Sequence, residues 1–258
     1  MGQRRLAYVA LAVGGVLLIA AAIGFFILQN RAPYRVSVNG PTLVTIDRGG
    51  TSLIEGHNSP SLAVDPANPN HLVLSERIDR PRFGCLVHVS DDGGSTWSNL
   101  TLPLPPNLDT CFAPDVAFTK GAILAVYLSL NTHPRDPLSG GNDPNGMFLA
   151  RSEDGGRAFS IAFRFPDKDN LQPRIVVDSN TDRVYVVYVK GNRFQNDTPL
   201  GLGPPPNPIM VTSAIGGVPP FSEPVQVTDP PRLRTAAPTP KVGPDGKLYV
   251  PAILPSED

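Results

Sequence analysis

Four prolines, at positions 60, 114, 173 and 238, each precede the residue that opens an apolar stretch. Two of the residues that follow them are charged, Asp115 and Arg174, and their counterparts are Ser61 and Thr239. A carboxyl group near a guanidinium suits acid catalysis combined with recognition of a carboxylate on a ligand. The same two residues also suit a structural ion pair or two solvated strand ends, and we favour a structural role.

Oxygen-bearing side chains gather in one polar stretch, at Asp136, Asn142, Asp143 and Asn145. Carboxylate and amide oxygens are the ligands that Ca²⁺ takes in proteins. A turn-rich polar loop explains these residues equally well, and we favour that interpretation. The four histidines show no metal-binding spacing. We therefore expect no cofactor, with calcium in this loop as the alternative.

The apolar stretches belong to a repeat. Each copy has a leading proline, a short apolar run, a turn and a second apolar run, at 59–75, 113–128, 172–188 and 237–251. Successive leading prolines are 54, 59 and 65 residues apart, since they lie at 60, 114, 173 and 238. Short apolar runs bounded by glycine and proline are typical of all-β proteins, and such a period indicates repeated structural units.

A second motif is interleaved with the first and reads Ser-x-Asp-x-Gly-x-x-aromatic. Its two intact copies consist of Ser90, Asp92, Gly94 and Trp97, and of Ser152, Asp154, Gly156 and Phe159. A degraded third copy starts at Ser213 and keeps Gly217, but has Ile215 in place of the aspartate. These residues resemble the Asp box, or bacterial neuraminidase repeat, and the resemblance covers about residues 58–258.

The resemblance implies an all-β protein, a β-propeller of four-stranded antiparallel blades. The Asp box would form the turn between the third and fourth strands of a blade, so its residues would be structural. About three and a half blades can be counted. We favour an incomplete propeller; the alternative is that a hairpin of residues 35–38 and 43–46 completes the fourth blade.

The strand order predicts which loops share a face. The turns between first and second strands are short, whereas the loops between second and third strands, at 130–146 and 190–207, are long. Binding residues concentrate on long loops that a rigid scaffold positions, so we expect the long-loop face to be functional. Cys85 and Cys111 fall on that face, where a disulfide is geometrically reasonable and chemically permitted in an exported chain.

The resemblance to sialidases also implies a glycosidase site at the central channel, with an arginine cluster and a Tyr–Glu nucleophilic pair. The Arg-Ile-Pro motif of that family is absent, and the matching stretch is His57–Ser61. We therefore expect a protein that binds a glycan or protein ligand, with Asp115 and Arg174 as the channel-mouth residues. The alternative is a glycoside hydrolase of the exo-sialidase type.

The N-terminal region predicts a membrane anchor. Residues 6–28 are uncharged and mostly apolar, and as a helix they would span about 34 Å, enough to cross a bilayer. We expect residues 1–5 in the cytoplasm, a linker at 29–57, and the propeller, 58–258, outside the membrane. A cleaved signal peptide is the alternative. The net charge of −1 gives no basis for nucleic-acid binding.

Overall fold

The computed structural model describes residue 44 and residues 56–79, 83–130, 146–166, 170–191, 206–228 and 236–253. All of them belong to one compact unit, Thr42–Asp258. Across these residues, no helix is long and apolar enough to cross a membrane. The expected anchor at 6–28 and the expected hairpin at 35–46 lie outside the described residues, apart from residue 44.

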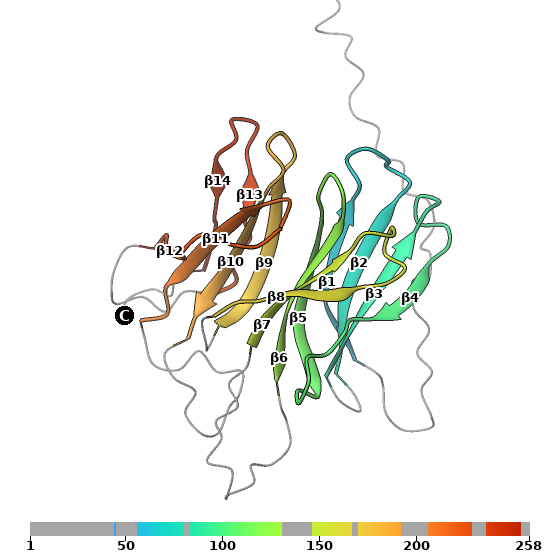
Figure 1. The fold of residues 1–258 in the computed structure, drawn as a ribbon, viewed down its shortest axis with the longest axis horizontal. Helices are drawn as coiled ribbons and strands as arrows, with labels where there is room; N and C mark the ends of the chain where they lie inside the picture. The colour runs from blue at the N-terminus through green and yellow to red at the C-terminus, as the bar shows by residue number, and fades with distance from the viewer. Residues whose placement is uncertain are drawn as a thin grey trace, which may run out of the picture. The chain divides into compact units, whose positions relative to one another are not determined.

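The described residues form three antiparallel four-stranded sheets and one two-stranded hairpin (Figure 1). In each four-stranded sheet the strands lie side by side in chain order, so every sheet is an up-and-down blade. Blade one consists of β1 (His57–Val64), β2 (Leu72–Ile78), β3 (Gly84–Ser90) and β4 (Ser98–Thr101). Blade two consists of β5 (Thr110–Phe118), β6 (Ile123–Leu130), β7 (Gly146–Ser152) and β8 (Ser160–Arg164).

Blade three consists of β9 (Asn170–Asp178), β10 (Arg183–Lys190), β11 (Ile209–Ile215) and β12 (Val225–Gln226), and the hairpin of β13 (Lys241–Val242) and β14 (Leu248–Tyr249). The prediction of all-β structure with four-stranded antiparallel blades is confirmed.

The fourth strand of blade three, β12, is shorter than the predicted 221–228. Two prolines at 219 and 220 and a third at 224 remove backbone donors near its start, which explains the short pairing.

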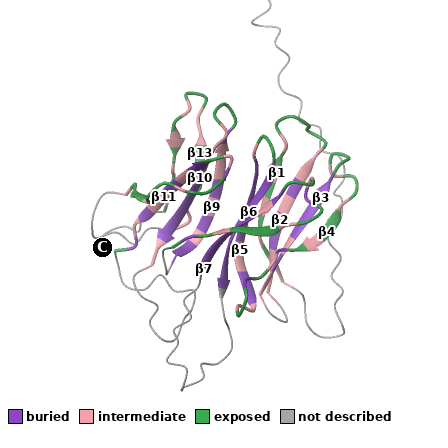
Figure 2. Ribbon diagram, in the orientation of Figure 1, coloured by how far each residue is buried: buried purple, intermediate pink, exposed green. Residues whose placement is uncertain are grey.

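The core lies between the blades. One buried cluster joins blades one and two and includes Val87, Val116 and Tyr127. A second cluster joins blades two and three and includes Leu124, Leu149 and Val186. Blade two has apolar residues on both faces because blades one and three cover its two sides, and Figure 2 shows its central strands among the most buried parts of the fold.

The first strands of successive blades contact one another, β1 with β5, β5 with β9, and β9 with β13. In each of the four copies of the repeat the residue before the leading proline has a positive φ: 54° at Ser59, 49° at Ala113, 50° at Gln172 and 49° at Ala237. The pairing register shifts at this point in β1, β5 and β9. Because proline cannot donate to a sheet ladder, the leading prolines of β1, β5 and β9 lie in bulges.

Candidate functional site

Asp115 connects three blades at the bulges of their first strands. Its Oδ1 accepts hydrogen bonds from Ser61 Oγ of blade one and, at 3.1 Å, from the backbone amide of Val116. Its Oδ2 accepts a hydrogen bond of 2.9 Å from the amide of Ile175 in blade three. Only 7% of Asp115 is exposed, so this carboxylate acts as an internal acceptor between blades.

Burial dominates the electrostatics of Asp115 and raises the pKa of its carboxyl group above the usual value. The hydrogen bonds from Ser61 and Ile175, and the nearby charge of Arg174, act against this rise. Arg174 acts on Asp115 through its charge, and among the described residues Arg174 Nε is buried without a hydrogen-bond partner. The two residues that the sequence singled out are therefore neighbours coupled by charge.

The same kind of connection continues to the hairpin. Oε1 of Gln172, the residue before the third leading proline, accepts a hydrogen bond of 2.6 Å from the amide of Ala237. The fourth residue of the predicted set, Thr239, is exposed and pairs with Pro251 through its own backbone amide. Of the four residues that follow the leading prolines, Ser61 and Asp115 thus form polar links between blades.

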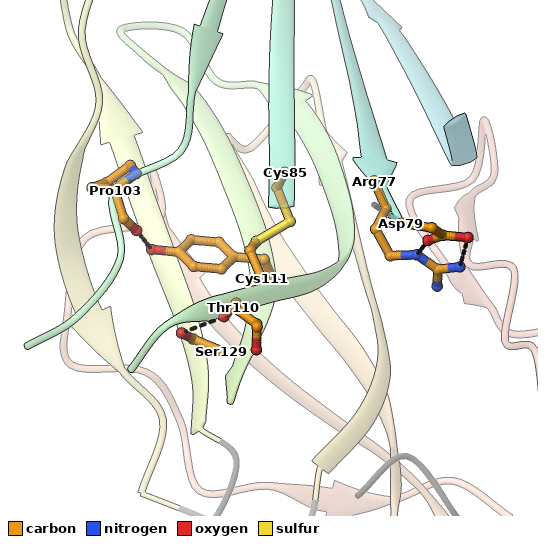
Figure 3. Close-up of a disulfide and its surroundings, with 8 residues drawn as sticks. Arg77, Asp79, Cys85, Pro103, Thr110, Cys111 and Ser129 are labelled. Carbon is orange, nitrogen blue, oxygen red and sulfur yellow. Dashed lines mark hydrogen bonds and ion pairs between the residues drawn. A yellow bond between two sulfur atoms is a disulfide. The ribbon is translucent and has the colours of Figure 1, made fainter. Parts of the chain in front are cut away.

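A disulfide between Cys85 and Cys111 joins the start of β3 to β5 (Figure 3). The Cα atoms of the two cysteines are 5.4 Å apart, and both side chains are buried. The amide of Cys111 also donates to the carbonyl of Phe83 at 3.1 Å. The loop that follows β2 and the connection that enters β5 are therefore held together at the long-loop face.

Next to the disulfide lies a group of polar and aromatic residues that we call the Arg77 cluster: Asn58, Arg77, Asp79, Phe83 and Phe112. Arg77 Nε and Nη2 donate to the carboxylate of Asp79 at 2.5 and 3.2 Å (Figure 3). Asn58 Nδ2 donates to the same carboxylate. The guanidinium carbon lies 4.1 Å from the ring centroid of Phe112 and 5.3 Å from that of Phe83. All five residues are partly or fully exposed.

A chain of polar side chains crosses all four strands of blade one. Glu76 Oε1 lies 2.8 Å from both His57 Nδ1 and His88 Nε2, and His88 Nδ1 lies 2.8 Å from Asn99 Oδ1. His88 is fully buried and Glu76 is 6% exposed. Sequence reasoning missed this network because the four residues are distant in the chain. The alternation of β2 and β3, which puts them on one face, was the available signal.

The two octapeptide turns lie between the third and fourth strands of blades one and two. Asp92 Oδ1 accepts from the amide of Thr96 at 2.8 Å, and the amide of Gly94 donates to Ser90 Oγ at 2.8 Å. Asp154 and Ser152 make the equivalent contacts with Ala158 and Gly156. These contacts lower the pKa of Asp92 to about 2, with the amide of Thr96 the largest cause. The aspartates are occupied in closing turns.

A hollow of about 530 Å³ lies on the face opposite the disulfide. The turns at 65–67, 119–122 and 179–182 line it together with His71 and Glu153. The ring of His71 contacts the ring of Phe118 edge-on, at 5.2 Å between centroids.

The sequence predicted function on the other face, whose long loops at 131–145 and 192–205 lie outside the described residues. The candidate calcium ligands Asp136, Asn142, Asp143 and Asn145 belong to the first of these loops and therefore also lie outside the described residues.

No protein-family model and no curated protein sequence matches the chain. Solved structures match its fold. An α-L-arabinanase of Penicillium chrysogenum, solved with arabinobiose, has a TM-score of 0.54 and 14% identity, over 75% of this chain and 56% of the enzyme. The GH93 α-L-arabinofuranosidase of Fusarium graminearum, with arabinobiose, has a TM-score of 0.50 and 14% identity, over 74% and 54% of the two chains.

A protein of unknown function from Dyadobacter fermentans has a TM-score of 0.53 and 15% identity, over 76% of this chain and 62% of that protein. The fold is a β-propeller, because the two fungal neighbours are β-propeller glycosidases. The chain spans a little over half the length of these solved structures. In this fold β1, β5, β9 and β13 are the first strands of successive blades, which puts Asp115 where the blades meet.

Proposed function

We propose that the chain is a carbohydrate-binding propeller and that its ligand site is the Arg77 cluster. The observation that carries this proposal is the pairing of the aromatic rings of Phe83 and Phe112 with the hydrogen-bonding groups of Asn58, Arg77 and Asp79. A sugar presents C–H faces that pack on aromatic rings, and hydroxyl pairs that bind planar polar groups. Sites of this mixed composition are typical of small-molecule recognition.

A binding role also agrees with the contacts that the Asp115 carboxylate makes. Glycoside hydrolysis usually requires two carboxyl groups flanking the bond that is cleaved. Asp115 is occupied by amide and hydroxyl donors from three blades, and its counterparts at the other three first strands are serine, arginine and threonine. The channel mouth therefore offers a single carboxylate from these four positions.

The experiment is a calorimetric titration of the full-length chain, in detergent micelles, with arabinobiose and with 3′-sialyllactose. Arabinobiose is the sugar bound in two solved neighbours, and sialyllactose tests the sialidase-like resemblance. We expect saturable binding of one of these sugars, weakened at least tenfold by Asn58→Ala or Asp79→Ala. The matched control is Asn68→Ala, an exposed asparagine in the turn after β1. Binding that Asn58→Ala and Asp79→Ala both leave unchanged would exclude the Arg77 cluster.

Glycoside hydrolysis is the second candidate, favoured by the raised pKa of Asp115, which is the property of a general acid. Release of 4-nitrophenol from an aryl α-L-arabinofuranoside, or of methylumbelliferone from an aryl sialoside, would detect it. Turnover that is lost in Asp115→Asn while the protein stays folded would replace the binding proposal with an enzymatic one.

We further propose that residues 6–28 anchor the propeller outside the membrane and that the two octapeptide turns are Asp boxes of the sialidase-like kind. The disulfide supports an exported location, because disulfides persist in oxidising compartments. Alkaline carbonate washing should leave the full-length chain in the membrane pellet. Release of a shortened soluble chain would instead indicate a cleaved signal peptide.

A further inference from the structure

The hollow on the face opposite the disulfide is enclosed by three successive blades. It measures about 530 Å³, which is within the range of about 300–1,000 Å³ that small-molecule sites occupy. The turns after β1, β5 and β9 line it, together with the octapeptide turn of blade two. Phe118, Ile123 and Val177 supply apolar side chains to this lining. The hollow therefore has the size and the mixed composition of a ligand site.

Contacts between blades hold the walls of the hollow in place. Asp182 Oδ1 of blade three accepts the backbone amide of Lys120 of blade two at 2.9 Å, and Lys120 Nζ donates to the carbonyl of Asn180 at 3.3 Å. On the other side, the ring of His71 of blade one packs edge-on against Phe118 of blade two. A ligand would therefore enter a site that the fold has already formed, which lowers the ordering cost of binding.

The charges that line the hollow are mostly negative. Asp65 lies in blade one, Glu153 in blade two and Asp182 in blade three, so each blade supplies a carboxylate. Lys120 is the only fixed positive charge among the described lining residues. The contacts of the three carboxylates with described residues each use a single oxygen atom, which leaves the other oxygen of each carboxylate for a ligand. The lining therefore favours a ligand with several positive charges.

A ring nitrogen at the hollow also lacks a hydrogen-bond partner. Nδ1 of His71 lies 3.4 Å from Asp91 Oδ1, and this carboxylate favours a proton on Nδ1. Nε2 of His71 is then an acceptor, and it is buried without a hydrogen-bond partner among the described residues. A buried acceptor without a donor is costly, and an ammonium group carries only donors. The histidine and the carboxylates thus favour the same kind of ligand group.

We propose that the hollow binds a linear polyamine. Its ammonium groups pair with the carboxylates of Asp65, Glu153 and Asp182, and the methylene segments between them contact the apolar part of the lining. An anion of the same size is disfavoured because it would face a carboxylate from each of three blades. The hollow lies on the opposite face from the Arg77 cluster, so this proposal is independent of sugar binding.

The test is a calorimetric titration of the full-length chain with spermidine, in micelles of an uncharged detergent. We expect saturable binding of a single spermidine per chain, weakened by added salt because the carboxylates are accessible to solvent. Asp65→Asn and Glu153→Gln should each weaken binding by about threefold or more. The matched control is Glu223→Gln, which removes an exposed carboxylate of blade three that does not line the hollow. It should leave spermidine binding unchanged.

A second pair of variants tests the hollow itself. Gly121 lines the hollow, and a Cβ at this position would meet no atom within 4 Å. A phenyl group placed there by Gly121→Phe should occupy the hollow and abolish spermidine binding. Gly84→Phe makes the same change at an equally open glycine of β3, on the disulfide face, and should retain binding. Far-UV circular dichroism checks that all variants fold.

A second titrant separates a polyamine site from simple attraction of counterions. Hexaamminecobalt(III) carries as many positive charges as spermidine at neutral pH but has no methylene groups, so it should bind more weakly than spermidine. The proposal would be overturned by an absence of saturable spermidine binding, or by equal affinity for hexaamminecobalt(III). Binding that Asp65→Asn and Glu153→Gln both leave unchanged, or that Gly121→Phe retains, would overturn it as well.

Discussion

Ser61 of blade one donates a hydrogen bond from its hydroxyl group to the carboxylate of Asp115 in blade two. The other oxygen of that carboxylate accepts the amide of Ile175 in blade three at 2.9 Å. One side chain therefore fixes the relative position of three first strands at their bulges. Because the residues are 54 and 60 positions apart in the chain, these contacts form only when the blades have assembled.

Replacing Asp115 with alanine should lower the free energy of unfolding by about 2–4 kcal/mol. The loss arises because the amide of Ile175 and the hydroxyl of Ser61 would remain in the interior without an acceptor, at about 1–3 kcal/mol for each buried group. Asp115→Asn should cost less, because an amide oxygen can still accept from Ile175. Urea unfolding followed by Trp97 fluorescence measures both.

Asp91→Ala is the control for Asp115→Ala, since the side chain of Asp91 is 69% exposed and lies 3.4 Å from the ring nitrogen Nδ1 of His71. It should change the free energy of unfolding by less than about 0.5 kcal/mol. A similar loss in Asp91→Ala and Asp115→Ala would mean that the links between blades contribute nothing specific.

The stability that Asp115 contributes should fall as the pH rises. Its pKa is higher in the folded state than the ordinary value of 3.8, so the folded chain holds this proton more tightly than the unfolded chain. The contribution of Asp115 to the free energy of unfolding is then greatest below about pH 4 and decreases as the pH rises through the folded pKa. Asparagine does not titrate, so wild type should lose stability relative to Asp115→Asn between about pH 4 and pH 7.

Urea midpoints of wild type and Asp115→Asn at several pH values in this window provide the measurement. A difference between the two proteins that stays constant, or grows in favour of wild type with rising pH, would show that the hydrogen bonds to Asp115 outweigh its burial.

The blades were predictable from the sequence because their signals are local. Alternating apolar residues mark strands such as β10, and glycine in the octapeptides marks the turn between third and fourth strands. Strand order then placed Cys85 and Cys111 on one face before any contact was known. The fourth strand of blade three was less predictable, because prolines interrupt its ladder while its apolar residues still indicate a strand.

The site was predictable only in part, because its contacts join residues that are far apart in the chain. The leading prolines identified Asp115 and Ser61, but another partner of the Asp115 carboxylate is the backbone amide of Ile175, which no side-chain pattern reveals. Nor did a pattern indicate the bridge of Glu76 between His57 and His88. The Arg77 cluster combines three strands and one loop, and it becomes visible only when the disulfide brings that loop to β5.

Removing the disulfide should destabilise the fold and loosen the Arg77 cluster. The two cysteines are 26 positions apart, and chain-entropy arguments give about 3 kcal/mol for a loop of this size. The Cys85→Ala, Cys111→Ala double variant should lose roughly this amount in urea unfolding. Non-reducing peptide mapping of the wild type is the accompanying check, and recovery of the two cysteine peptides unlinked would contradict the structure.

The close approach between blades can be measured at the turn glycines. Gly156→Ala adds a Cβ at a φ of +87°, 2.7 Å from Val89 of the neighbouring blade, whereas Gly94→Ala adds one at a φ of +91° with no atom nearer than 3.4 Å. Both variants pay the backbone cost of a side chain at positive φ, about 1 kcal/mol. Only Gly156→Ala also crowds an interface between blades, so it should lose about 1–3 kcal/mol more in urea unfolding.

The added loss should be relieved by making space across the interface. Val89→Ala alone is destabilising because it leaves a cavity, but combined with Gly156→Ala it removes the clashing methyl group, so the two losses should be less than additive. Val87→Ala, a buried valine two residues earlier in β3, provides the control and should add its full cost to Gly156→Ala. Strict additivity with Val89→Ala would show that contact between the blades does not require glycine at position 156.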